Sequence, residues 1–273
     1  MKLKELYSTV KSILIKNNIE SASFETEMLL NHFCNIDRKA ILLGDDREVE
    51  NAGAVLTALE KRINGTPLQY ILGKWEFYGR EFFVGEGVLI PRPDTEILVK
   101  ETLKILTPNM QVADLCSGSG CIAITLEKEI ENLKVFALEK SEKAFSFLEK
   151  NIALNKSAVN PILCDVLDYN NLNSLDCIVS NPPYIQSSVV PTLSKEVQNE
   201  PKMALDGGED GLFFYREIVS KWKDKLKSGG HIIFEIGYDQ AAAVSEILAQ
   251  NGFFDIKVVK DYSQNNRVIK AVK

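Results

Sequence analysis

The strongest constraint on the fold is an alternation, from about residue 97 onward, of short apolar runs with longer amphipathic stretches. The short runs have the length of buried strands, and apolar residues recur at helical spacing in the stretches between them. This alternation predicts a doubly wound α/β domain with helices on both faces of a parallel sheet. The expected strands are 111–115, 133–138, 160–164, 175–180, 230–236, 253–259 and 266–272, and the expected helices are 96–106, 121–130, 142–154, 209–227 and 239–250.

The final two strands, 253–259 and 266–272, follow one another too closely for a crossover helix. We therefore expect them to form an antiparallel hairpin at the edge of the sheet. The predicted fold is a seven-stranded, Rossmann-like sheet whose last strand is antiparallel.

The residues before this region have a different pattern. Residues 1–73 have apolar side chains at helical spacing, with Ser23 as a candidate N-cap of the second helix and a third helix over about 48–62, and they predict a small helical bundle. Residues 74–88 contain two short aromatic runs around a Tyr-Gly-Arg turn, which predict a β-hairpin linker. The α/β domain is expected to span 89–273.

Composition excludes several classes of protein. The net charge of −6 and the near-neutral bundle argue against a basic face for nucleic acid. No apolar stretch is long enough to span a membrane and no signal peptide is evident at the start, so we expect a cytoplasmic protein. The five cysteines lack C-x-x-C spacing and only two histidines, His32 and His231, are present. We therefore expect reduced, structural cysteines and no metal site.

A small-residue loop follows the strand 111–115 and precedes a helix, which is typical of a nucleotide site. Gly118 and Gly120 let a ligand approach the backbone closely. A lone G-x-G is weak evidence, but Glu139 closes the next strand and can accept both hydroxyls of a ribose. Asp165 and Val166 end the third strand, where they can meet an adenine.

The order of these groups favours S-adenosylmethionine over NAD. Asp114 stands just before the loop and suits an α-amino group, or water beside it, so an ammonium, a ribose diol and an adenine each have a candidate partner. The loop lacks a full G-x-G-x-x-G pattern, although Ala123 at its last position is tolerated. The cofactor-binding residues that we predict are Asp114, Cys116, Ser117, Gly118, Ser119, Gly120, Glu139, Asp165, Val166 and Asn181.

The tetrapeptide Asn181-Pro182-Pro183-Tyr184 follows the apolar strand 175–180. Both prolines fix φ, so the carbonyls of Asn181 and Pro182 are held in set directions. The Asn181 side-chain oxygen and a fixed carbonyl can accept both hydrogens of one planar NH2 group, with the Tyr184 ring against its plane. We predict that all four residues bind the substrate and that Asn181, Pro182 and Tyr184 are catalytic. The alternative is an ordinary Pro-rich turn.

With these motifs in order, the chain resembles class I S-adenosylmethionine-dependent methyltransferases. Four further stretches narrow the resemblance to the release factor glutamine methyltransferases of the HemK/PrmC type: GTPLQYILGKWEFYG (65–79), LIPRPDTE (89–96), EPKMALDGGEDGLFFYR (200–216) and EIGYDQ (235–240). The resemblance runs nearly end to end. Two residues depart from the usual pattern, because Cys116 stands where glycine is usual and Glu139 where aspartate is common.

The resemblance implies methylation of the glutamine amide in the Gly-Gly-Gln motif of class-1 peptide release factors. S-adenosylmethionine would be the methyl donor and S-adenosylhomocysteine the product. The helical bundle would dock the protein substrate, and we expect a monomer that contacts neither nucleic acid nor membrane. Because no base is positioned to deprotonate the amide, we expect direct in-line displacement with the proton lost afterwards. Positioning and two fixed dipoles would supply the catalysis.

Two other functions remain open from the residues alone. The NPPY sequence also occurs in adenine-N6 methyltransferases, which extract a base from a nucleic acid. A nucleotide-binding regulatory module without catalysis is the third possibility. The segment 200–216 is either a lid or support for NPPY, or an ordinary loop that caps the next helix. Roles for Arg92, Asp94 and Glu96 are left open.

Overall fold

The computed structural model describes residues 1–273, which form two compact units. One unit consists of Met1–Gly73 with Lys195–Asn199, and the other of Lys74–Ser194 with Glu200–Lys273. The helices of the first unit are α1 (Leu3–Lys16), α2 (Ala22–Cys34), α3 (Arg38–Leu42), α4 (Ala52–Ile63), α5 (Leu68–Leu72) and α9 (Lys195–Gln198).

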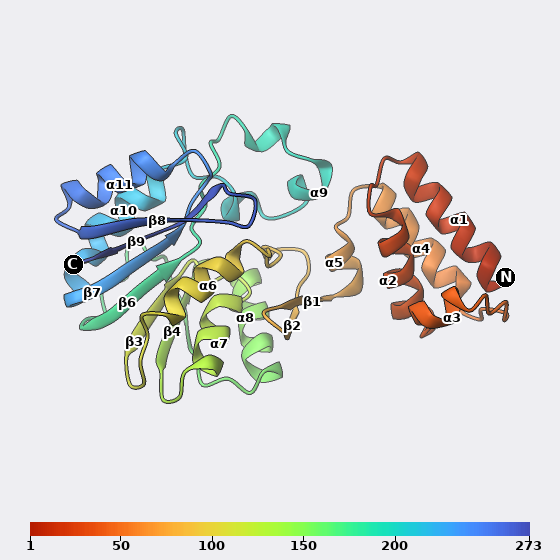
Figure 1. The fold of residues 1–273 in the computed structure, drawn as a ribbon, viewed down its shortest axis with the longest axis horizontal. Helices are drawn as coiled ribbons and strands as arrows, with labels where there is room; N and C mark the ends of the chain where they lie inside the picture. Colours follow the sequence, from red (N-terminus) through yellow and green to blue (C-terminus); the bar gives the residue numbers. More distant parts are fainter. The chain divides into compact units, whose positions relative to one another are not determined.

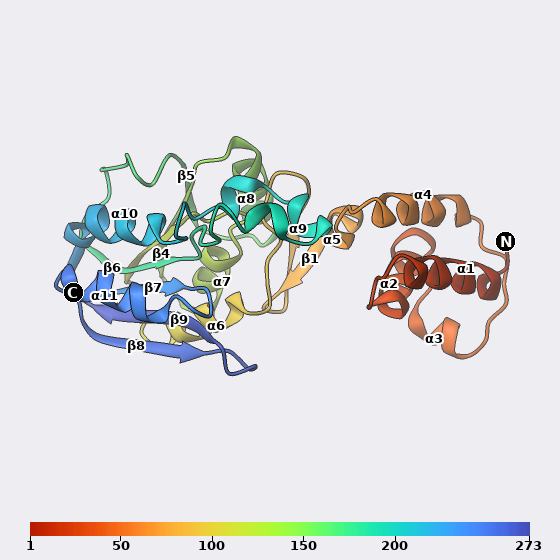
Figure 2. The same cartoon turned by 90° about the horizontal axis from the view of Figure 1, so that it is seen from above.

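The first unit is built on α1, α2 and α4, which lie side by side (Figure 2). Each of these helices turns an apolar face toward the core of the unit. The fully buried side chains there include Leu6, Val10, Leu29 and Val55. No helix of the protein combines the length and hydrophobicity needed to cross a membrane.

Two predicted helix starts in this unit were wrong. The second helix begins at Ala22, and Ser21 precedes it with its hydroxyl donated to Glu25 rather than accepting a backbone N–H. The third helix begins at Ala52, after a turn, because Glu48 pairs with Lys2 in an antiparallel bridge and the Val49 N–H is donated to the Met1 carbonyl at 2.9 Å. Contacts of residues 48 and 49 with the N-terminal residues thus move the start of this helix later than the local sequence pattern predicts.

The second unit contains a hairpin and a seven-stranded sheet. The hairpin pairs β1 (Lys74–Phe77) with β2 (Arg80–Phe83). The sheet has the strand order β5-β4-β3-β6-β7-β9-β8 (Figure 1). Its strands are β3 (Gln111–Leu115), β4 (Lys134–Glu139), β5 (Asn160–Leu163), β6 (Leu175–Ser180), β7 (Leu226–Glu235), β8 (Phe254–Lys260) and β9 (Asn266–Val272). The helices are α6 (Thr95–Leu103), α7 (Cys121–Glu129), α8 (Glu142–Leu154), α10 (Phe213–Trp222) and α11 (Ala241–Gln250).

Helices cover both faces of the sheet, as the alternation of elements predicts. Val112 in β3 faces one core with α6, α7 and α8, and its neighbour Ala113 faces a second core with α10 and α11. Successive strand residues point to opposite faces, so near-continuous apolar strands build two cores at once.

The predicted antiparallel pairing at the end of the chain is confirmed. β9 pairs antiparallel with both β7 and β8, and it lies between them. The last strand of the sequence is therefore inserted into the sheet, and β8 forms the edge. The seven-stranded, Rossmann-like sheet is as expected.

Candidate active site

A pocket of about 900 Å³, including its open mouth, lies in the second unit at the carboxyl ends of β3, β4, β5 and β6. Ligands of open α/β sheets bind at this edge. The pocket is lined by Gly87, Leu89, Ile90, Pro91, Arg92, Thr95, Cys116, Ser117, Gly118, Ser119, Cys121, Ile122, Glu139, Lys140, Ser141, Ala144, Asp165, Val166, Asn181, Pro183, Pro201, Met203, Ala204 and Phe214.

The loop from Cys116 to Gly120 forms the floor of the pocket. Cys116 has φ +61°, a left-handed conformation that glycine adopts most easily. Cys116 thus adopts a backbone conformation that suits the glycine usual at this position, although it has a side chain. A Cβ at Gly120 would lie 2.4 Å from Leu148 Cδ1, so only glycine permits α8 to pack this closely on the loop. A Cβ at Gly118 would meet nothing within 4 Å, which leaves its backbone open to a ligand.

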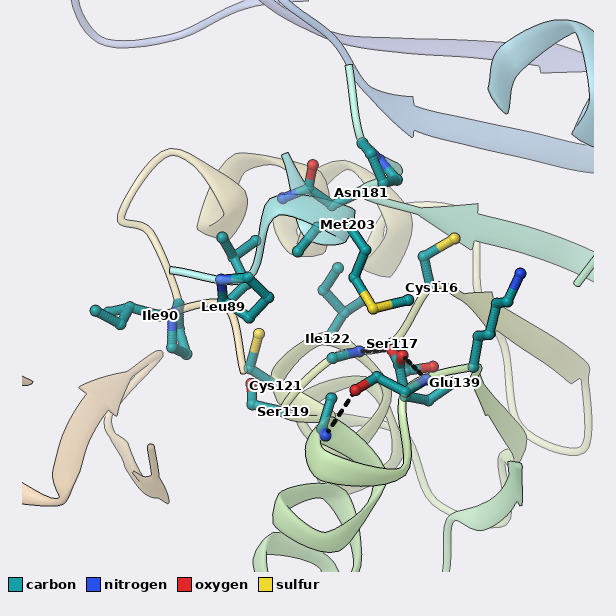
Figure 3. A pocket seen from close by; sticks show the side chains of 18 of the residues that line it. Leu89, Ile90, Cys116, Ser117, Ser119, Cys121, Ile122, Glu139, Asn181 and Met203 are labelled. Carbon is teal, nitrogen blue, oxygen red and sulfur yellow. Dashed lines mark hydrogen bonds between the residues drawn. The ribbon is translucent and has the colours of Figure 1, made fainter. Parts of the chain in front are cut away.

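Glu139 lies at the end of β4 and is only 8% exposed. Its Oε2 accepts a 2.8 Å hydrogen bond from the Gly118 N–H, and its Oε1 accepts one of 2.7 Å from the Ser141 N–H. Burial raises the pKa of this carboxyl, although the backbone N–H groups oppose the shift. In Figure 3, Glu139 and Asn181 stand at opposite sides of the pocket with Met203 between them.

Asp165 and Val166 also line the pocket, as predicted for the adenine end. The Asp165 carboxylate pairs with Lys140 Nζ at 2.6 Å and accepts the Leu167 N–H at 2.9 Å. Burial opposes ionisation of Asp165, but these two partners outweigh it and hold the pKa below its usual value. Val166 is buried and supplies an apolar contact beside this charge.

Asp114 is fully buried and is not among the lining residues. Its Oδ2 accepts a hydrogen bond of 3.2 Å from the Ala123 N–H, in the first turn of α7, while its Oδ1 has no partner. Burial raises the pKa of Asp114 to about 8. The predicted contact between Asp114 and an ammonium group stays a prediction.

The NPPY residues divide between the pocket and the structure behind it. Asn181 and Pro183 line the pocket, but Pro182 and Tyr184 do not. Asn181 Nδ2 donates to Thr95 Oγ1 at 3.3 Å, and its Oδ1 accepts no hydrogen bond within the chain. Asn181 therefore lines the pocket with an amide oxygen that has no hydrogen-bond partner within the chain.

Tyr184 is anchored from several sides. Its hydroxyl donates to Glu235 Oε1 at 3.3 Å, and its carbonyl accepts the Gln240 side-chain amide at 2.9 Å. The Gly207 and Gly211 backbones approach so closely that a Cβ at either would lie 2.6 Å or less from Tyr184 backbone atoms. The segment 200–216 thus supports NPPY, one of the two roles considered for it.

The same segment also forms one wall of the pocket. Met203 and Ala204 line the cavity, and Glu200, only 5% exposed, accepts the Ile90 N–H at 3.0 Å and pairs with Arg92. Sequence reasoning missed Thr95, Glu200, Met203 and Glu235 as functional residues. All four lie in the segments that carry the family resemblance, which is the signal that could have identified them.

The other two residues whose roles were open serve the surroundings of the site. Asp94 forms an ion pair of 3.3 Å with Arg267, and Glu96 accepts the Tyr78 N–H at 3.0 Å. The second contact holds the start of α6 against the hairpin. Neither residue lines the pocket.

The pocket fits S-adenosylmethionine. An open loop backbone at Gly118 lies next to the Glu139 carboxylate, which has one hydrogen bond on each oxygen and further acceptor capacity for a diol. Val166 and Ile122 provide apolar contact beside these polar groups. The donor and acceptor set therefore suits a nucleoside with a hydroxylated sugar.

Two protein families match parts of the chain. Residues 5–73 match the PrmC N-terminal domain, and residues 93–209 match the methyltransferase small domain. Over 282 residues the chain is 39% identical to a release factor glutamine methyltransferase of Clostridium botulinum, with 100% of both chains covered. Over 253 residues it is 40% identical to the protein of the same description from Thermodesulfovibrio yellowstonii, with 90% of each covered.

Among solved structures, a methyltransferase from Pyrococcus furiosus superposes with a TM-score of 0.56 and 19% identity. The match covers 72% of this chain and 90% of that one. At this identity the likeness concerns the fold alone.

Proposed function

We propose that this chain, which belongs to the family of release factor glutamine methyltransferases, transfers a methyl group from S-adenosylmethionine to the glutamine side-chain amide in the Gly-Gly-Gln motif of class-1 peptide release factors. The observation that carries the proposal concerns Asn181, which lines the pocket. Its NH2 group donates to Thr95, and its Oδ1 is left without a partner in the chain. A primary amide offers two N–H donors, and this oxygen accepts one of them.

The cofactor would be held by the loop Cys116–Gly120 together with Glu139, Asp165 and Val166, all of which line the pocket. Glu139 would accept the ribose hydroxyls, and Asp165 with Val166 would meet the adenine. Asp114 and Asn181 complete the set predicted for the cofactor, although Asp114 is buried and does not line the pocket, so its contact with the ammonium group stays a prediction. Bound S-adenosylmethionine supplies a methyl group on a positively charged sulfur and leaves as S-adenosylhomocysteine.

The residues of NPPY would hold the substrate nitrogen for attack. Asn181 Oδ1 and the Pro182 carbonyl accept its two N–H groups, while Pro183 and the Tyr184 ring confine the amide plane. As the nitrogen gains positive charge during transfer, both N–H groups become stronger donors, so two fixed acceptors stabilise the transition state more than the ground state.

No side chain in the pocket is suited to deprotonating the amide first. The lining contains no histidine, and burial raises the pKa of the Cys121 thiol to about 12, so this thiol stays neutral. The proton is therefore lost from the nitrogen after methyl transfer, when it has become acidic.

The partner that follows from this function is a release factor, which the helical unit would dock. We further propose that the protein acts as a monomer in the cytoplasm, where its substrate functions, and needs neither nucleic acid nor membrane.

The proposed function is tested by incubating the protein with methyl-labelled S-adenosylmethionine and a purified class-1 release factor. The matched substrate is the same factor with its Gly-Gly-Gln glutamine replaced by alanine. We expect label on the first and none on the second. Labelling of adenine-containing DNA or RNA, with none on either protein, would instead establish the adenine-N6 reaction.

The role of Asn181 is tested in the same assay. Asn181→Ala should lower kcat by about 10²–10³, the range for loss of one preorganised polar partner. The control is Asn251→Ala, because the Asn251 amide donates only to the Ile247 carbonyl of its own helix. Near-wild-type turnover in Asn181→Ala would show that the acceptor role is wrong.

A further inference from the structure

We infer that Thr95 and Glu235 form a directional relay that orients the Asn181 amide, so that its oxygen and not its NH2 group faces the substrate. This inference rests on the proposed role of Asn181 as an acceptor. It assigns a function to two residues outside the NPPY motif, both of them positioning residues.

The three side chains come from separate parts of the second unit. Thr95 is the first residue of α6, Glu235 is the last residue of β7, and Asn181 follows β6. Thr95 and Glu235 are each only 2% exposed. The Thr95 hydroxyl lies 2.6 Å from Glu235 Oε2, and Asn181 Nδ2 lies 3.3 Å from Thr95 Oγ1.

The direction of these bonds follows from the number of hydrogens. A threonine hydroxyl has one hydrogen, and an ionised carboxylate can only accept. While Glu235 is ionised, Thr95 must therefore donate its hydrogen to Glu235, and the 2.6 Å separation between the Thr95 hydroxyl and Glu235 Oε2 is that of a charge-assisted bond. The Thr95 oxygen can then only accept from Asn181, which fixes the NH2 of Asn181 toward Thr95 and leaves its oxygen toward the pocket.

Glu235 itself is held in place by two tyrosines. Tyr184 donates its hydroxyl to Glu235 Oε1 at 3.3 Å, and Tyr215 donates its hydroxyl to the Glu235 carbonyl at 2.8 Å. Each carboxylate oxygen of Glu235 thus accepts one hydrogen bond from a hydroxyl, Oε2 from Thr95 and Oε1 from Tyr184. The same carboxylate fixes Asn181 and Tyr184, so it couples the two polar ends of the tetrapeptide.

A side chain that could donate at the position of Glu235 would undo this order. Glutamine has the same shape, but its NH2 group can donate to Thr95 Oγ1. The Thr95 hydroxyl would then be free to donate to a flipped Asn181 amide, whose NH2 would face the NH2 of the substrate. Two donors would oppose each other at the point where the reaction needs an acceptor.

The inference is tested with the full chain in the release factor assay, by measuring kcat, KM for the release factor and the dissociation constant of S-adenosylmethionine. Thr95→Val and Glu235→Gln should each lower kcat between about tenfold and a hundredfold, the range for leaving one polar group unpaired. In Glu235→Gln, cofactor affinity should stay within about threefold of wild type, because Glu235 does not line the pocket. Thr95→Ser, which keeps the hydroxyl, should recover most of the turnover that Thr95→Val loses.

The matched control is Thr102→Val, which makes the same change in the same helix. The Thr102 hydroxyl is fully buried, but it donates to the Leu98 carbonyl of α6 and has no link to the pocket. Equal effects of the two Thr→Val changes on kcat, or no recovery with Thr95→Ser, would overturn the relay.

Thermal unfolding of each variant shows whether it folds. Should Thr95→Val fail to fold, Glu235→Gln and Thr95→Ser decide the question, because full turnover in Glu235→Gln refutes the relay and a low kcat with intact cofactor binding supports it. Wild-type protein that fails to label a release factor would instead refute the proposed function. The two failures are therefore distinguishable.

Discussion

The Glu139 carboxylate accepts a 2.8 Å hydrogen bond from the Gly118 N–H, which ties the end of β4 to the loop between β3 and α7. Its second oxygen accepts the Ser141 N–H at the start of α8. One buried side chain thus holds two backbone segments that line the pocket, and it keeps acceptor capacity for a ligand there.

We expect Glu139→Gln to weaken binding of S-adenosylmethionine by about tenfold to a hundredfold, as measured by calorimetry. An amide must turn its NH2 group toward one of the two backbone N–H donors, so one charge-assisted bond becomes a repulsive contact and acceptors for the ribose are lost. The control is Glu142→Gln, because Glu142 is exposed in the first turn of α8. An unchanged dissociation constant in Glu139→Gln would contradict the role.

Asn151 in α8 provides a second prediction, because it is fully buried and links three segments. It accepts the Phe83 N–H at 2.6 Å and donates to the carbonyls of Phe83 and Ser119. Asn151→Ala leaves these buried groups unpaired, and we expect it to lower the free energy of unfolding by about 2–4 kcal/mol. Because Ser119 belongs to the cofactor loop, affinity for S-adenosylmethionine should fall as well.

Asn155→Ala is the control, because Asn155 lies one turn later, directly after the last residue of α8. Asn155 also donates to the hairpin, at the Glu81 carbonyl, but it has no contact with the cofactor loop. A smaller loss of stability and unchanged cofactor affinity are expected for Asn155→Ala. Equal cofactor affinities for the two variants would show that Asn151 acts only on stability.

The strands of the sheet could be predicted from the sequence because each is a short apolar run with its own local pattern. Three of them, 111–115, 175–180 and 266–272, have the predicted bounds. The five-residue helices α3 and α5 were not predicted, since so short a segment shows no periodicity. The family resemblance is confirmed by relatives that align over the whole chain.

The site could be predicted only where it is contiguous in sequence. The loop 116–120 and the NPPY tetrapeptide are local motifs, whereas the contact between Thr95 and Glu235 joins residues 140 positions apart and that between Arg92 and Glu200 joins residues 108 apart. Whether a carboxylate is buried, and what it accepts, depends on packing that no local pattern contains. The predicted contacts of Pro182 and Tyr184 with the substrate stay predictions.

A third prediction concerns Arg62 in the helical unit, which is 4% exposed. Its guanidinium donates two hydrogen bonds to the buried Glu25, of 2.6 and 3.0 Å, and one of 2.6 Å to Glu196. Arg62→Met leaves the Glu25 charge buried and uncompensated, so we expect a loss of about 3–5 kcal/mol in the free energy of unfolding of this unit. Chemical denaturation followed by circular dichroism measures it.

Two variants make the interpretation specific. Lys61→Met, at the exposed neighbouring position of α4, should change stability little. The double change Arg62→Met with Glu25→Met removes both buried charges and should recover much of the loss. If Arg62→Met is as harmless as Lys61→Met, the ion pairs do not stabilise the unit.

The last prediction is a pH dependence of turnover that arises from Glu235. Burial raises the pKa of Glu235 to about 7, although the Thr95 and Tyr184 hydroxyls and the Arg267 charge oppose the shift. The polar and charged groups that face it are Thr95 and Asp94 at the start of α6, Tyr184 after β6, Tyr215 in α10 and Arg267 in β9.

The sign follows from the direction of the relay. Above its pKa, Glu235 is ionised and can only accept, which keeps the Asn181 oxygen toward the substrate. Below its pKa, the protonated carboxyl can donate to Thr95, as glutamine would. We therefore expect kcat at saturating substrates to fall as the pH decreases through about 7.

The pH profile of kcat in Glu235→Gln should lack this fall and remain low throughout. Burial also raises the pKa of Asp114, to about 8, but Asp114 titrates in both proteins, so the difference between the two profiles isolates Glu235. Identical profile shapes for wild type and Glu235→Gln would show that protonation of Glu235 does not control the orientation of Asn181.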